Sequence, residues 1–142
     1  MSRPTPKATL VVIDNRDPRA CTLTGYRGPR IVPQHRKGGA GWRPDKHAPA
    51  NIVWLDSLIN GRIEAEPDLQ LRAKVYGVKV PFWADNEMVP VWYAAESTWY
   101  ALKGDERIPL AIDDAHGMMH AVYGPDWFEW LRQVEMEGQF RW

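Results

Sequence analysis

Three side chains near the end of the chain have types and spacing that could bind a metal ion. Asp113, His116 and His120 stand at positions i, i+3 and i+7, so a helix would carry them on one face. Two imidazoles one turn apart beside a carboxylate can hold a divalent cation, which would suit a metal-dependent hydrolase or nuclease. The motif lacks the glutamate of the HExxH zinc-protease helix, and an aspartate-capped helix with two histidines packed on tryptophan explains the same residues. The metal site is therefore the alternative hypothesis, and the leading one needs no cofactor.

A second set of candidate residues lies in the basic segment 16–46. Its cations are mostly arginines, and Tyr26 and Trp42 are interleaved with them. Guanidinium groups suit bidentate contacts to phosphate or carboxylate, and aromatic rings can stack on bases. No recognition helix, zinc finger or RNA-binding signature accompanies them. The segment predicts a site for a protein partner or a nucleic acid with an anionic surface, with these contact residues: Arg27, Arg30, Arg36, Lys37, Trp42 and Arg43.

The formal charges are divided unevenly along the chain. Residues 1–50 contain ten Lys or Arg and three Asp or Glu, a net charge of +7, whereas residues 51–142 contain eight and fifteen, a net charge of −7. Such an asymmetry is typical of a basic arm that meets an anionic partner. It is equally explained by a basic segment that folds over its own acidic domain, and charge alone does not choose between the two.

Composition narrows the class of protein further. The chain has eight tryptophans, which predict a core of large aromatic side chains. The alternative is an exposed aromatic surface for a partner or for stacked bases. The single Cys21 excludes an internal disulfide framework and favours a reducing compartment. The apolar run at residues 10–13 is too short for a signal sequence or a membrane span. We therefore expect a cytoplasmic protein with no membrane contact.

The elements that would position these residues follow from hydrophobic spacing and turn chemistry. A length of 142 residues fits a single domain over residues 1–142, with an extended Gly/Pro-rich basic segment at 15–49 and an acidic, Trp-rich α+β core over 50–142. Alternating and β-branched residues predict a small antiparallel sheet with strands near 8–14, 69–83, 89–94, 97–102 and 107–112. A four-residue hairpin loop is expected at 103–106. Helical spacing predicts helices near 50–60, 114–123 and 125–137.

These observations favour a non-enzymatic binding protein that acts through segment 16–46 and exposed aromatic residues. Small, Trp-rich chains without a catalytic motif are typical of accessory proteins of mobile elements and phages, so an inhibitor or adaptor is expected by analogy. A structural assembly protein, whose N-terminal arm wraps a neighbouring subunit, is a further alternative. The sequence does not predict the oligomeric state.

Overall fold

A computed structural model describes residues 4–38 and 45–137 of the chain. This part contains five α-helices, two short 3-10 helices and two small antiparallel sheets, which confirms the predicted α+β fold. The elements follow in this order: α1 (Lys7–Arg16), β1 (Ile31–His35), η1 (Pro49–Asn51), β2 (Ile52–Asp56), α2 (Ser57–Ala65), α3 (Pro67–Val75), η2 (Asn86–Met88), β3 (Val91–Tyr93), β4 (Thr98–Lys103), β5 (Glu106–Leu110), α4 (Ile112–Tyr123) and α5 (Asp126–Glu137).

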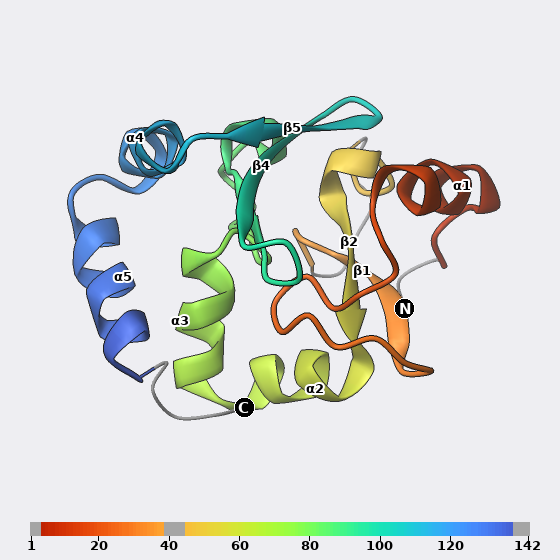
Figure 1. Ribbon diagram of the computed structural model, residues 1–142, viewed down its shortest axis with the longest axis horizontal. Helices are drawn as coiled ribbons and strands as arrows, with labels where there is room; N and C mark the ends of the chain where they lie inside the picture. The colour runs from red at the N-terminus through yellow and green to blue at the C-terminus, as the bar shows by residue number, and fades with distance from the viewer. Residues whose placement is uncertain (1–3, 39–44, 138–142) are drawn as a thin grey trace.

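The strands form two separate sheets. One pairs β1 with β2, in a register that runs from Ile31 opposite Asp56 to His35 opposite Ile52. The other has the order β3-β4-β5. Figure 1 shows β1, β2 and α1 on one side, α4 and α5 on the other, and α3 between them. None of the helices in the described ranges has the length and apolar character needed to cross a bilayer.

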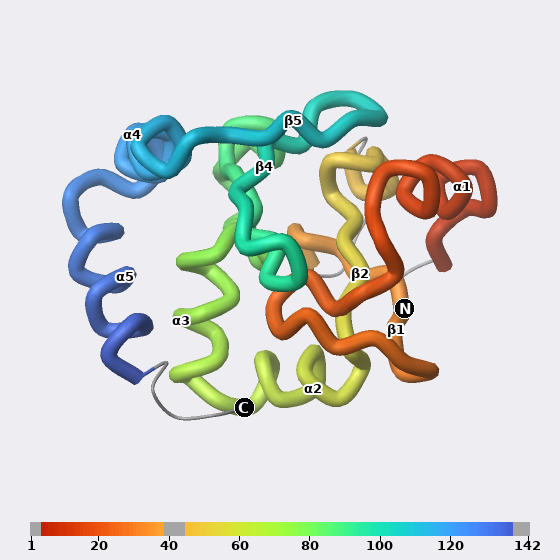
Figure 2. The backbone as a smooth tube through the Cα atoms, viewed as in Figure 1, coloured from red at the N-terminus to blue at the C-terminus, as the bar shows by residue number. Residues whose placement is uncertain are grey.

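The segment between α1 and β1 joins the two sheets. Thr22 donates its backbone N–H and its Oγ1 hydroxyl to the carbonyl of Trp54 in β2, both at 2.9 Å. The carbonyl of Thr22 in turn accepts the N–H of Ala94, just after β3, at 2.9 Å. In Figure 2 this part of the chain runs across the front of β2. A stretch that the sequence predicts as extended and basic is thus built into the interior of the fold.

The core consists of two main clusters of buried side chains. In the first, Val53 and Leu55 of β2 pack on α2 and α3. The second is aromatic: Trp127 of α5 is fully buried, and its ring centroid lies 6.3 Å from that of Trp99 in β4. Nε1 of Trp127 donates to the carbonyl of Val75 at 3.3 Å. The expected core of large aromatic side chains is therefore present, and through it α4 and α5 pack against α3 and β4.

Three predicted elements are wrong. The strand expected near 8–14 is helix α1, because Leu10, Ile13 and Arg16 fall on one helical face toward β2. The helix expected near 50–60 is strand β2 followed by α2. All five residues of β2 are buried, and a fully buried strand cannot be distinguished from a buried helix by periodicity. Asp56 ends the strand and caps α2 by accepting the N–H of Leu58 at 2.9 Å.

The strand expected near 69–83 is helix α3 followed by a loop. Pro67 occupies the first turn of α3, where its missing N–H costs nothing, and Leu69 and Ala73, four residues apart, are buried on one face. The alternation from Tyr76 onward belongs to a loop, which turns at Gly77 with φ of +75°. The N–H groups of this loop bond the carbonyls of Ala73 and Arg36, and the carbonyl of Tyr76 accepts the N–H of Trp92 in β3, so the loop does not form a strand of its own.

The remaining elements agree with the sequence. Strands β3, β4 and β5 lie within or beside the ranges 89–94, 97–102 and 107–112, and helices α4 and α5 match 114–123 and 125–137. The hairpin loop is shorter than expected: Lys103 pairs with Glu106, so the connection has two residues instead of four. Gly104 supplies the positive φ of 55° that such a tight turn requires.

Candidate functional site

The structure places most of the cations of segment 16–46 inside the protein or in ion pairs. Four of these side chains are buried: Arg16, Arg36, Lys37 and Lys46. Lys37 pairs with Asp45 at 3.2 Å. The predicted contact residues Trp42 and Arg43 lie outside the described residues. Within the described part, segment 16–46 therefore contributes to the interior of the domain.

Among the predicted contact residues that the structure describes, Arg36 is the most buried, with 1% of its surface exposed. Its guanidinium donates to four backbone carbonyls, those of Gly77, Ala50, Asn86 and Val89, at distances from 2.6 to 2.9 Å. Burial lowers the pKa of Arg36 to about 10, so the group stays charged at neutral pH. Arg36 ties three separate stretches of chain together and is inaccessible to a partner.

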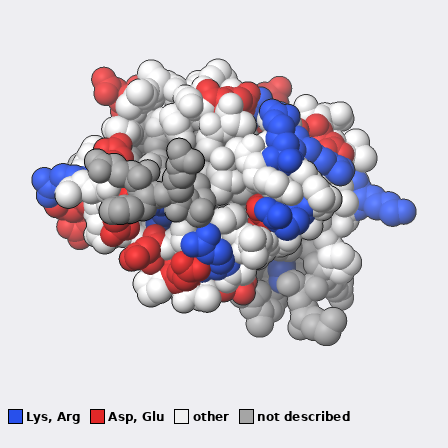
Figure 3. All heavy atoms as spheres, turned by 60° about the horizontal axis from the view of Figure 1, so that its bottom comes forward, with Lys and Arg blue, Asp and Glu red and all other residues white. Residues whose placement is uncertain are grey.

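Arg27 and Arg30 are the two predicted contacts that the structure leaves on the surface. Arg30 forms a bidentate ion pair with Asp56 at 2.8 and 2.9 Å, and its guanidinium carbon lies 4.4 Å from the ring centroid of Tyr26. Figure 3 shows that Lys and Arg side chains gather mainly on the right half of the face drawn there. A modest basic surface remains, but much of the charge of Arg30 is already neutralised.

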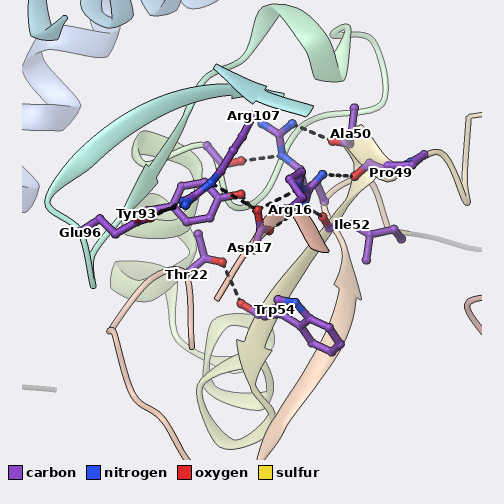
Figure 4. Close-up of polar contacts among 12 residues, drawn as sticks. Arg16, Asp17, Thr22, Pro49, Ala50, Ile52, Trp54, Tyr93, Glu96 and Arg107 are labelled. Atoms are coloured by element: carbon purple, nitrogen blue, oxygen red, sulfur yellow. Dashed lines mark hydrogen bonds and ion pairs between the residues drawn. The ribbon is translucent and has the colours of Figure 1, made fainter. Parts of the chain in front are cut away.

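A chain of ion pairs fixes α1 against the three-stranded sheet. Asp17, directly after α1, accepts Nε and Nη2 of Arg16 at 2.9 and 2.8 Å and the hydroxyl of Tyr93 at 3.0 Å. Arg107 of β5 lies 3.9 Å from Asp17 and forms a bidentate pair with Glu96. Figure 4 shows Arg16, Tyr93 and Arg107 converging on Asp17. Burial raises the pKa of Tyr93, with a further contribution from Asp17, and the bond from Arg107 lowers the pKa of Glu96.

An open cleft of about 580 Å³ lies beside this chain of ion pairs. It has these lining residues: Val12, Asn15, Arg16, Asp105, Glu106 and Arg107. The lining holds no serine, cysteine or histidine, and its two arginines are engaged by Asp17 and Glu96. The acidic and basic groups here satisfy one another. We therefore assign the ion-pair chain a structural role, which is to hold the segment after α1 in place.

The alternative metal centre does not form a cluster of ligands. His116 packs against aromatic rings, with its centroid 5.0 Å from Trp127 and 6.1 Å from both Trp99 and Phe128. His120 is exposed beside Phe128, and Asp113 is exposed in the first turn of α4. Across residues 4–38 and 45–137, no group of three His, Cys, Asp or Glu side chains is placed to hold a metal ion. The packing of His116 on Trp127 thus agrees with the packing interpretation. The expected aspartate cap is wrong, because the N-cap residue of α4 is Ala111 and no side chain caps it.

Two exposed aromatic residues are neighbours on the loop between α3 and η2. Phe82 is 79% exposed and Trp83 is 59% exposed, and Met88 follows on η2 at 47%. The ring of Trp83 stands edge-on to Tyr123 of α4 with centroids 5.9 Å apart, and Tyr123 stands edge-on to Trp130 of α5 at 5.7 Å. We call Phe82, Trp83, Tyr123 and Trp130 the aromatic surface.

The aromatic surface has a cation at one end and a rigid support beneath it. Nζ of Lys74 lies 4.3 Å from the ring centroid of Trp130 and 5.2 Å from that of Tyr123. The loop that carries Phe82 and Trp83 is closed by the N–H of Ala84 bonding the carbonyl of Pro81 at 3.1 Å. The Asp85 carboxylate caps η2, and Arg36 holds the carbonyls of Asn86 and Val89. The exposed rings are consequently presented by a fixed backbone.

The sequence contains little to mark this surface in advance. The high tryptophan count leaves an exposed aromatic surface open as the alternative to an aromatic core, and it does not identify which rings would form that surface. The adjacent pair Phe82 and Trp83 follows Pro81, and in a strand two neighbouring side chains point to opposite faces, so one of them would be exposed in any case. Only the loop conformation puts both into solvent.

Comparison of the chain with models of known families, with curated proteins and with solved structures finds no match.

Proposed function

We propose that this protein is a non-enzymatic binding protein, an adaptor or inhibitor, that docks onto a partner protein through the aromatic surface. The observation that carries the proposal is the exposure of Phe82 and Trp83, at 79% and 59%, side by side on a braced loop. Scattered single apolar residues on a surface are ordinary. Two neighbouring aromatic rings that continue into Tyr123 and Trp130 form a patch of the kind that supplies interface hot spots.

Energetics support a protein partner. Burying one such side chain contributes about 1.5–3 kcal/mol, and the loop is already ordered, so little conformational entropy is lost on binding. Tryptophan and tyrosine are enriched at interface hot spots. By contrast, the described cations of segment 16–46 are largely buried or paired, which weakens the case for a nucleic acid held by that segment.

The test is affinity capture from a native lysate with tagged protein, followed by mass spectrometry with and without nuclease. The full chain is compared with the double variant Phe82→Ala/Trp83→Ala. A matched control is Val11→Ala/Leu58→Ala, which removes two apolar side chains of similar exposure, 60% and 57%, from α1 and α2. The proposal expects partners that survive nuclease and high salt, that are retained by the control, and that are lost from the aromatic variant.

Other outcomes point to the competing hypotheses. Capture that disappears with nuclease, weakens steeply with salt and depends on Arg27 and Arg30 would indicate a nucleic acid and refute the proposal. Concentration-dependent self-association in light scattering, abolished by Phe82→Ala/Trp83→Ala, would show that the aromatic surface serves assembly with a second copy. Retention of every partner by the aromatic variant would also refute it.

A further inference from the structure

The chain has four histidines, and two of them meet across the base of the segment that follows β1. His35 is the last residue of β1, and His47 lies just before η1. Nε2 of His35 and Nδ1 of His47 are 3.3 Å apart, with ring centroids 5.2 Å apart and an interplanar angle of 52°. Both residues are half-buried, so their rings are held by the protein yet can be reached by a small ion.

These distances differ from those of a good hydrogen bond. Nitrogen donors usually approach their acceptors to about 2.9–3.0 Å along a nearly straight line. A straight bond of 3.3 Å between the two rings would put the centroids about 5.6 Å apart, whereas they are 5.2 Å apart. At least one ring is therefore turned away from the line that joins the two nitrogens.

The separation of the two nitrogens has the dimensions of metal coordination. Two nitrogens 3.3 Å apart that each lie about 2.0–2.1 Å from one ion, as in tetrahedral zinc sites, make an angle of about 104–111° at that ion, which is close to the tetrahedral angle. We propose that His35 and His47 form a two-imidazole binding site for a divalent ion of the zinc type. Imidazole nitrogen suits zinc, copper and nickel in preference to magnesium or calcium.

The backbone around the pair is fixed before any ion arrives. His35 is paired with Ile52 in the sheet, and its carbonyl accepts Nζ of Lys79 at 3.2 Å. The carbonyl of His47 accepts Oγ1 of Thr9 from α1 at 3.2 Å. Contacts from β2, from α1 and from the loop after α3 thus hold the backbone of both residues in place, which reduces the entropy lost on coordination.

The protein supplies two ligands, and the other coordination positions are left to water. No third His, Cys, Asp or Glu joins the pair among the described residues, and residues 1–3, 39–44 and 138–142 contain none of these four types. The ion is consequently expected to exchange and to bind more weakly than at a closed structural zinc site with four protein ligands. Its effect would be to clip the residues before η1 onto the end of β1.

The test is isothermal titration of zinc chloride into the chelator-treated full chain, with His35→Ala and His47→Ala as test variants. His116→Ala and His120→Ala are matched controls, because they remove the other histidine pair. The inference expects one zinc ion per chain, at least tenfold weaker binding in each test variant, and unchanged binding in both controls. Circular dichroism checks folding of each variant, and His47→Gln serves if an alanine variant unfolds.

A second measurement reads the ligand atoms directly. In long-range ¹H–¹⁵N spectra, zinc should shift Nε2 of His35 and Nδ1 of His47 and leave the ring nitrogens of His116 in place. Zinc binding that persists in His47→Gln, that is lost only in the His116 or His120 variants, or that is absent from the wild type would overturn the inference. Because the aromatic surface shares no residue with the pair, these outcomes are independent of partner docking.

Discussion

Replacing Arg36 by methionine should cost more stability than replacing any exposed arginine. The four carbonyls that Arg36 bonds belong to Ala50, Gly77, Asn86 and Val89. Methionine fills much of the same volume but donates no hydrogen bond. Three buried carbonyls then lose their partner, whereas that of Asn86 keeps the N–H of Val89 at 3.4 Å. The perturbation thus removes the bonds without opening a large cavity.

The magnitude follows from two opposing effects. A buried polar group left without its partner costs about 1–3 kcal/mol, so three carbonyls at a middle value of about 2 kcal/mol each lose about 6 kcal/mol. Burial holds the pKa of Arg36 at about 10, below its ordinary 12.5, and removing that buried charge returns about 3 kcal/mol. The net loss is about 3 kcal/mol, which is a substantial part of the about 5–15 kcal/mol that stabilises a typical domain.

The assay is urea unfolding followed by tryptophan fluorescence and circular dichroism. Arg36→Met should show a much lower midpoint with the same m value, since the surface exposed on unfolding is unchanged. The control is Arg27→Met, an exposed arginine of the same segment, which should stay within about 0.5 kcal/mol of the wild type. An Arg36→Met protein within about 1 kcal/mol of the wild type would refute the assignment of Arg36 as an internal brace. If the assignment holds, a loss of partner binding on neutralising Arg36 together with Lys37 and Arg43 would reflect a loss of folding and would not identify these residues as contacts.

Three further substitutions test the core, a turn and an ion pair. Trp127→Ala should cost about 3–5 kcal/mol in urea unfolding because the ring is fully buried. The ring of Trp83 is 59% exposed, so Trp83→Ala should cost less than about 0.5 kcal/mol. Equal losses in the two variants would contradict the placement of the two rings. Gly77→Ala should lower the free energy of unfolding by well over about 1 kcal/mol, because φ is +75° and a Cβ would meet the Pro90 carbonyl oxygen at 1.8 Å. Gly104 has open space around it, so Gly104→Ala should cost about 1 kcal/mol. The bond from Arg30, assisted by the N–H of Leu58, lowers the pKa of Asp56. The ionised Asp56 carboxylate therefore contributes its full stabilisation to the fold above about pH 4, and this contribution is lost as the pH falls through the lowered pKa. Asp56→Asn, which keeps the helix cap, should therefore flatten the fall of the melting temperature between about pH 4 and pH 2, and an unchanged slope would contradict the ion pair.

The sequence predicts the last third of the chain well because the signals there are local. The apolar spacing in α4, the Gly124-Pro125 break and the turn around Gly104 each specify a conformation within a few residues. The failures lie where tertiary contacts override local preference. Residues 11–13 are β-branched, yet α1 forms because Ile13 and Arg16 gain buried partners on β2.

The candidate site is less predictable than the fold, since residues of the same type in the same segment can be either exposed or buried. Arg27 and Arg36 are both arginines in a Gly/Pro-rich stretch, yet one is exposed and the other is 1% exposed. The difference comes from residues 14 to 53 positions away whose carbonyls surround Arg36. His35 and His47 likewise have no motif between them, and the pairing of β1 with β2 contributes to bringing them together.

Arg36 also connects the two candidate sites, which leads to a final test. It follows His35 directly in the chain, and its guanidinium holds the carbonyls of Asn86 and Val89 behind the loop that carries Trp83. Arg36→Lys keeps the charge but replaces the planar fork by three donors on one nitrogen, so it cannot hold all four carbonyls. We expect this variant, measured under conditions where circular dichroism shows it folded, to weaken both zinc binding and partner capture.

The single-site variants provide the contrast. Trp83→Ala should impair partner capture alone, and His47→Gln should impair zinc binding alone, because the two side chains share no contact that the structure shows. If Arg36→Lys left both readouts at wild-type values, the two sites would not depend on this arginine. If Arg36→Lys altered only one of the two readouts, Arg36 would support only the site that this readout measures.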